Sequence, residues 1–216
     1  MGIAERRERE KQQRQQDIID AAERIFFSKG IQQATMDDVA NEAELSKGTL
    51  YLYFKSKDEL YLAITLRGIQ IMTEMFQKAA QNPASGLEKA FAIGAAFFTF
   101  AKKYPNYFDA ISHFELDELQ FDDGCVLACE CSEEGQGALD ILIGALKQGV
   151  EDGSIREDID PGRMATIMWG MSSGIIQLAA LKGKHLEQEH GFNMKGIVEE
   201  SFEVFRCALE RKAKHA

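Results

Sequence analysis

Prolines and cysteines are scarce in this chain, and the signatures of secreted proteins are missing. Only three prolines occur in 216 residues, at Pro83, Pro105 and Pro161, so long stretches contain no residue that breaks a helix. Four cysteines in a chain of this length do not resemble a disulfide framework. The charged N-terminus lacks the apolar segment of a secretory signal. We therefore expect a protein of the reducing cytoplasm.

The motifs of common enzyme classes are also missing. We find no nucleotide-binding loop, no suggestive pair of carboxylates and no nucleophile motif, so an enzyme is not predicted, nor is a cofactor or a metal site. No segment alternates apolar and polar residues as a half-buried strand does, and no internal repeat is present. The predicted fold is all-α.

One apolar segment raises the question of a membrane. Residues 164–181 carry no charge over 18 positions, which is near the roughly 20 apolar residues that a membrane helix needs. The segment includes Thr166, Ser172, Ser173 and Gln177. We interpret it as a helix packed against protein and predict no membrane partner.

The net charge of −10 argues against nucleic acid until its distribution is considered. The segment 45–57 contains three lysines and no acidic residue. Residues 1–16 have a net charge of +2 and are rich in glutamine, which is typical of a frayed helix start or a disordered arm. Two small positive regions on an acidic chain suit a DNA-binding protein that makes few phosphate contacts.

Four helix starts fall within about 45 residues of the N-terminal part. The first helix has apolar residues at helical spacing from Ile18 to Phe26 and stops at Gly30. Capping-box patterns at residues 35–38 and 56–59 open a short helix that ends near residue 43 and a long helix over 57–81. Between them Ser46 is an N-cap candidate for a helix that ends near Phe54. The very tight turn before Ser46 is typical of a helix-turn-helix.

The rest of the chain is predicted to form further helices. Gly153 ends one of them, and Asp160 followed by Pro161 is an N-cap with proline at the first helical position. The predicted helices span 87–103, 106–119, 125–152, a segment from Pro161 that includes 164–181, and 194–212.

The helix from Ser46 to Phe54 has two distinct faces. Leu50 and Phe54 share the inward face, whereas the outward face has hydroxyl groups, a lysine and tyrosines but no acid. A capped helix end without an acidic residue leaves its positive end available to phosphate, and its N-terminal half can enter the major groove. For the two tyrosines the alternative is that they only cover an apolar seam. The outward and flanking residues are Ser46, Lys47, Gly48, Thr49, Tyr51 and Tyr53.

Over residues 15–65 this sequence resembles the TetR family of bacterial regulators, from Thr35 through the run LSKGTLYLYF to Leu60. The resemblance implies a three-helix DNA-binding head, a variable helical body that binds a ligand, and a homodimer. It implies phosphate contacts for Thr35 and Lys57, base contacts for Lys47, Gly48 and Thr49, and phosphate or base-methyl contacts for Tyr51 and Tyr53. Glu44 departs from the family, which often has glycine there, so the turn geometry is expected to differ slightly.

We predict a helix-turn-helix DNA-binding domain over residues 14–74 and a helical domain for effector binding and dimerisation over 75–216. The segment 153–161 resembles the family's link between two late helices, which implies that the last two helices form the dimer interface. Gly170 and Gly174 permit close helix contact there. The alternative is that the penultimate helix is an ordinary core helix of one subunit.

Aromatic residues of the body are candidates for an effector pocket that takes a small hydrophobic molecule. The alternative is that most of these rings are plain core. Cys125 and Cys129 share a helical face, and with Cys131 they raise the alternatives of thiol sensing and ordinary helix cysteines. The candidate pocket residues are Phe97, Phe98, Tyr104, Tyr107, Phe108, Phe114 and Trp169.

The sequence thus favours a DNA-binding transcriptional regulator, a homodimeric repressor that releases double-stranded operator DNA when its effector binds. The alternative is a DNA-bound structural or protein-recruiting factor with the same head and no effector. The sequence does not specify the effector, the operator, the regulated genes or the choice between repression and activation.

Overall fold

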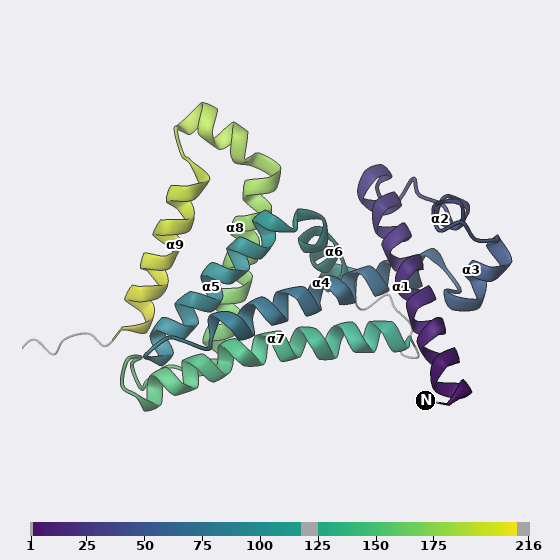
Figure 1. Cartoon of the computed structure of the whole chain (residues 1–216). Coiled ribbons are helices and arrows are strands. Elements are labelled where there is room, and N and C mark those ends of the chain that lie inside the picture. Colours follow the sequence, from purple (N-terminus) through teal and green to yellow (C-terminus); the bar gives the residue numbers. More distant parts are fainter. Residues whose placement is uncertain (1, 118–124, 211–216) are drawn as a thin grey trace, which may run out of the picture. The chain divides into compact units, whose positions relative to one another are not determined.

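The computed structural model describes residues 2–117 and 125–210, and within them it contains helices and no strand (Figure 1). The all-α prediction is confirmed. The predicted end residues Leu119 and Lys212 lie outside the described residues. The helices are α1 (Ile3–Lys29), α2 (Met36–Glu42), α3 (Lys47–Tyr53), α4 (Lys57–Ala79), α5 (Gly86–Lys103), α6 (Pro105–Asp117), α7 (Val126–Glu151), α8 (Pro161–His190) and α9 (Met194–Leu209).

The described residues form two compact units. The first comes from Met1–Gln70 and Asn106–Glu133, and the second from Ile71–Pro105 and Glu134–Ala216. The sequence-based division at residue 74 is continuous along the chain, whereas these units are not. The reason lies in contacts such as the hydrogen bond from the Tyr107 hydroxyl of α6 to the Glu23 carboxylate of α1, 2.6 Å long. α6 therefore packs with the N-terminal helices.

The first unit is built around a core that α1, α2, α3 and the start of α4 share. Ile18, Ala22 and Phe26 of α1 are buried there, as the spacing predicted, together with Leu50 and Phe54. Helix α1 begins at Ile3, so residues 3–16 are helical rather than a frayed or disordered arm. Exposed pairs one turn apart support this extension, such as Arg6 with Glu10 at 2.7 Å.

The second unit contains all of α5, α8 and α9, with α8 and α9 joined as an antiparallel hairpin (Figure 1). The start of α5 lies directly against the end of α7, because a Cβ on Gly86 would clash with the backbone of Gly149. The backbone amides at the start of α5 find their hydrogen-bond acceptors in residues that directly follow α7. Gly86 N–H donates to the Asp152 carboxylate at 2.8 Å, and Leu87 N–H donates to the Ser154 hydroxyl at 3.1 Å.

Helix α8 is, among the described residues, the one helix long and apolar enough to cross a membrane by length and composition. Its N-cap is Asp160 with Pro161 at the first position, as predicted. Most of the apolar segment is not buried by the rest of this chain. Within one subunit, the segment therefore packs against protein on one face only. Ala165, Met168 and Ser172 are the buried residues of that face.

Candidate nucleic-acid interface

The turn between α2 and α3 closes with two characteristic hydrogen bonds. Leu45 N–H donates to the Ala40 carbonyl at 2.8 Å, and Glu44 N–H donates to the Asn41 carbonyl at 3.1 Å. This is the pattern of a Schellman motif, which requires a left-handed residue after the helix. Glu44 occupies that position with φ of +53°. The turn therefore keeps the geometry that a glycine would give, and Glu44 adopts a conformation that disfavours its side chain.

Helix α3 begins at the predicted N-cap. The Ser46 hydroxyl accepts a hydrogen bond from Thr49 N–H at 3.1 Å, and the hydroxyl oxygens of the two residues are 2.8 Å apart. Leu50 and Phe54 are fully buried, so the inward face is confirmed. The Thr49 hydroxyl thus has a partner within the cap and faces the same end of the helix as Lys47 and Gly48.

The outward face of α3 is exposed, and part of it is open to close approach. A Cβ added to Gly48 would meet nothing nearer than the Ser46 hydroxyl oxygen at 3.9 Å. Packing within the protein therefore does not require glycine at this position. Tyr51 is 37% exposed, whereas Tyr53 packs partly against the core of the unit. Leu52, which the sequence analysis did not single out, is 76% exposed beside them and offers an apolar contact for a thymine methyl.

Lys47, a predicted base-contacting residue, already has an acidic partner. Its ammonium lies 2.7 Å from the carboxylate of Asp37 on α2, and this hydrogen bond raises the pKa of Lys47. Both side chains are more than half exposed, so the pair is weak and solvent-screened. DNA phosphate or a guanine edge would compete with Asp37 for this lysine.

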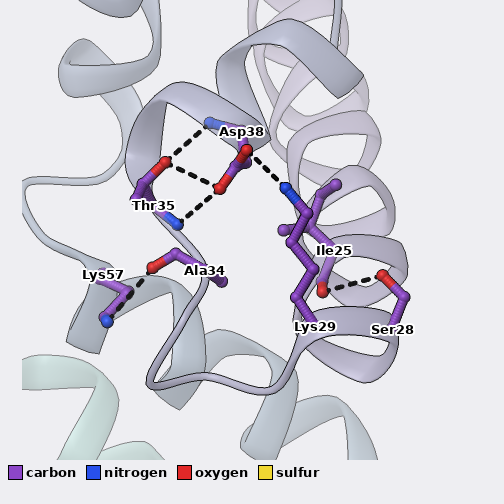
Figure 2. Close-up of polar contacts among 7 residues, drawn as sticks. All are labelled: Ile25, Ser28, Lys29, Ala34, Thr35, Asp38 and Lys57. Atoms are coloured by element: carbon purple, nitrogen blue, oxygen red, sulfur yellow. Dashed lines mark hydrogen bonds and ion pairs between the residues drawn. The ribbon is translucent and has the colours of Figure 1, made fainter.

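The start of α2 is a complete capping box (Figure 2). The Thr35 hydroxyl accepts from Asp38 N–H at 3.1 Å, and Thr35 N–H donates to the Asp38 carboxylate at 3.0 Å. Lys29 of α1 approaches the same carboxylate at 2.7 Å. The hydrogen bond from Lys29, followed by those from Thr35, lowers the pKa of Asp38 to about 2. Thr35, predicted to contact phosphate, is thus held at the first turn of α2.

Lys57 contributes to the architecture of the same region. Its ammonium donates to the Ile31 carbonyl at 2.8 Å and to the Ala34 carbonyl at 3.3 Å, so it links the start of α4 to the loop before α2 (Figure 2 shows the contact with Ala34). The sequence pattern predicted a phosphate clamp here. The structure places the lysine where it fixes the loop that presents Thr35, which the pattern did not indicate.

The residues predicted for an effector pocket do not gather in one place. Phe97 and Trp169 lie in the second unit, where their rings stack with centroids 4.7 Å apart beside Phe76, and they line a cavity of about 20 Å³. Phe98 lines a separate groove, described below. Tyr104 ends α5, with the Lys103 ammonium 4.8 Å from its ring centroid.

The other three rings predicted for the pocket belong to the first unit. Phe108 and Phe114 are buried there, and Tyr107 packs edge-on against Phe27 with ring centroids 5.3 Å apart. Tyr107 also donates to Glu23, whose carboxylate lies 2.8 Å from Arg67. These rings belong to α6, which is rich in aromatic residues like α5 of the second unit but packs within the first unit.

The described cysteines are free thiols that differ in burial. Cys131 is buried, and its thiol donates to the Leu62 carbonyl at 3.5 Å. Cys129 is exposed and Cys125 is half-buried. No group of three or more His, Cys, Asp and Glu side chains in residues 2–117 and 125–210 could hold a metal ion.

Comparison with known proteins gives this geometry a family. The model of the N-terminal domain described as "Bacterial regulatory proteins, tetR family" matches residues 18–64, which include α2, the turn and α3. The fatty acid metabolism regulator protein of Bacillus subtilis is 26% identical over 190 residues, covering 83% of this chain and 95% of that protein. Residues 18–64 are therefore the DNA-binding domain of a TetR-family transcriptional regulator. The HTH-type transcriptional repressor KstR2 of Rhodococcus jostii is 29% identical over 149 residues, covering 68% of this chain and 70% of that protein.

Solved structures of TetR regulators share the fold. The structure of FadR from Bacillus subtilis in complex with stearoyl-CoA matches with a TM-score of 0.69 and 21% identity over 89% of this chain and 98% of that chain. The ketosteroid regulator KstR2 of Mycobacterium tuberculosis matches with a TM-score of 0.65 and 15% identity over 92% and 96%. The body as well as the head therefore has the fold of these regulators.

Proposed function

We propose that this protein is a cytoplasmic repressor without enzymatic activity that binds operator DNA as a homodimer and releases it when a small apolar effector binds. The observation that carries the proposal is α3, a capped helix whose inward residues are buried and whose first half is exposed. Within α3 itself no acidic side chain is present. Such an end attracts phosphate and fits the major groove.

The contacts that we assign to DNA follow from the positions of the exposed groups. Lys47, Gly48 and Thr49 lie at the start of α3 and would face base edges, with Tyr51 and Tyr53 beside them on backbone or base methyls. Thr35 at the start of α2 would contact phosphate. Lys57 would act mainly by holding the loop that precedes Thr35, since its ammonium already donates hydrogen bonds to two backbone carbonyls of that loop.

An apolar stripe on α8 supports the homodimer. Ile167, Met171, Leu178 and Leu181 follow helical spacing and are between 40% and 83% exposed. Val204 of α9 is also more than half exposed. An exposed apolar face of this length is typical of a subunit interface. A dimer would also present two copies of α3 to half-sites one helical turn apart, about 34 Å, or a multiple of it.

The relatives support an effector of apolar character. One is named for fatty acid metabolism, and solved neighbours include a complex with stearoyl-CoA and a ketosteroid regulator. An effector that binds preferentially to a form unable to span both half-sites would release DNA. A factor that binds DNA without any effector is the alternative that the experiment must separate.

The test begins with selection of binding sites from random DNA by the purified full-length protein. We expect a palindromic site that is bound by a dimer. Lys47→Ala and Tyr53→Ala should each weaken binding at least several-fold, and Lys47→Ala should also change the preferred bases. If both variants bind the selected site as tightly as the parent, α3 is not the DNA-reading helix. A protein that remains monomeric at micromolar concentration would contradict the dimer.

A further inference from the structure

A second apolar space lies beside the aromatic cavity, between three helices of the second unit. It is an open groove of about 480 Å³, which we call the α5–α8–α9 groove. This volume falls in the range of ordinary small-molecule sites, roughly 300–1,000 Å³. The cavity beside Phe97 and Trp169, at about 20 Å³, holds little more than one water. The apolar lining of the groove comes mainly from Phe98, Ala101, Ile175, Ile176, Ala179 and Val198.

The groove and the cavity are neighbours along all three helices. On α9, Val198 lines the groove and Phe202, one turn later, lines the cavity. The Phe202 ring lies 5.8 Å from that of Phe98, centroid to centroid, and leans on Gly94, where an added Cβ would meet it at 3.2 Å. The two phenylalanine rings therefore lie between the groove and the cavity.

Rotation of these rings would join the two spaces into one path. On α8 the path runs from Met168 in the cavity to Ala180 in the groove, twelve residues apart, or about 18 Å at the rise of an α-helix. Its shape would be long and narrow, and its lining apolar apart from Ser172 in the cavity and the lysines at one end. Such a path fits an extended hydrocarbon chain better than a compact polycyclic molecule.

The groove has positive charge where the apolar lining ends. Lys102 of α5 and Lys195 of α9 line it, and both are exposed. Lys195 has a loose partner in Glu199 at 3.5 Å, and no acidic side chain lines the groove. Lys195 is also in the first turn of α9, where the helix dipole is positive. These charges favour an anionic group at this position.

The groove is separate from the proposed dimer interface. On α8 the groove residues Ile176 and Ala179 occupy a different face from Leu178 of the exposed stripe, and Ile175 lies at the border, one turn after Met171. Pairing of two subunits through the stripe would therefore leave the side of the groove at Ile176 and Ala179 available to a small molecule.

We propose that the α5–α8–α9 groove binds an elongated amphiphile, with an anionic group at Lys102 and Lys195 and an apolar chain directed past Phe98 and Phe202 toward Trp169. This proposal rests on the proposed function, because it names the class of the effector. The anion is either a free carboxylate or the phosphates of an acyl thioester. Both place negative charge at the end of a hydrocarbon chain.

The test is calorimetric titration of the full-length protein, without DNA, with three matched compounds: dodecanoate, dodecanoyl-CoA and dodecan-1-ol. We expect at least one of the anions to bind about tenfold more tightly than the neutral alcohol, and their relative affinities distinguish carboxylate from phosphates. An exposed ion pair contributes up to about fivefold, so two lysines account for a difference of this size. The double variant Lys102→Gln/Lys195→Gln should lose this preference.

Two further variants separate the groove from general effects. Lys182→Gln/Lys184→Gln removes two exposed charges from α8 outside the groove and should leave all affinities unchanged. Ala179→Trp fills the groove and should abolish binding. The proposal is overturned if the alcohol binds as well as both anions, or if the Lys102/Lys195 variant binds as the parent does. Binding of operator DNA is measured separately, so a protein that binds DNA but none of the three compounds refutes this inference and leaves DNA binding intact.

Discussion

Replacement of Glu44 by glycine tests the geometry of the helix-turn-helix through stability. Glu44 is the one non-glycine residue with positive φ among those described, at +53°, and its backbone amide is fixed by the Asn41 carbonyl. The left-handed conformation brings a Cβ close to the following carbonyl oxygen, a contact that glycine lacks. The Glu44 side chain is exposed and forms no hydrogen bond or ion pair with the described residues that would offset this strain.

The expected gain is the difference between two terms. Left-handed backbone disfavours a residue with a Cβ by about 1–2 kcal/mol. Glycine in turn costs about 0.5–1 kcal/mol through the greater freedom of the unfolded chain. We therefore expect Glu44→Gly to raise the free energy of unfolding by up to about 1.5 kcal/mol, with a central value of about 0.75 kcal/mol.

The assay is urea unfolding, followed by circular dichroism, of the parent protein, Glu44→Gly and Glu44→Ala. Alanine also has a Cβ and should leave the unfolding midpoint within error of the parent. The glycine variant should unfold at higher urea with unchanged slope. Equal destabilisation by glycine and alanine would mean that the turn does not hold Glu44 in the left-handed conformation.

Two further predictions concern side chains that hold the head together. Asp38 has a pKa of about 2 in the folded state, below its value of 3.8 in the unfolded chain, so its carboxylate stabilises the fold above pH 4 and loses this effect as pH falls toward 2. Asp38→Asn should therefore be less stable than the parent at pH 6, and the difference between their unfolding midpoints should narrow from pH 4 to pH 2.5. A difference that stays constant would show that the ionised Asp38 carboxylate does not stabilise the fold. Tyr107→Phe keeps the ring but removes the hydrogen bond to Glu23, and should cost about 1–2 kcal/mol in urea unfolding. No loss of stability in that variant would show that the bond to Glu23 contributes nothing net.

The sequence predicted the helices well because their ends are encoded locally. The caps at Thr35, Ser46 and Asp160 were found as predicted, since each depends on one short side chain and a backbone amide three residues later. The two faces of α3 followed from the spacing of Leu50 and Phe54 in the same way. Local patterns are sufficient where the interaction spans a single turn.

Contacts between distant residues were not visible in the sequence. Nothing near Lys57 indicates that its ammonium reaches carbonyls 23 and 26 positions earlier, and nothing near Lys47 selects Asp37 rather than phosphate. The aromatic residues of α6 resemble those of α5, but only tertiary packing assigns Tyr107 to the head. The number of aromatic residues in the sequence is therefore larger than the number that line one cavity, which includes Phe97 and Trp169 of those predicted.

The groove was missed for a related reason. Large aromatic residues fill space, whereas an open groove is lined by small residues such as Ala101 and Ala179 and by the stems of lysines. Small residues on a helix give no sequence signal that distinguishes close helix packing from open space. Only the positions of α5, α8 and α9 within their unit reveal the difference.

DNA reading by α3 is tested most directly with Gly48→Ala. Since an added Cβ has no neighbour closer than 3.9 Å and alanine favours helix, the variant should be as stable as the parent or more stable by up to about 1 kcal/mol. The added methyl group would instead meet the DNA. We predict that affinity for the selected operator falls at least tenfold while the urea midpoint stays the same or rises. Operator affinity equal to that of the parent, in a variant with unchanged stability, would contradict the placement of this helix end against the DNA.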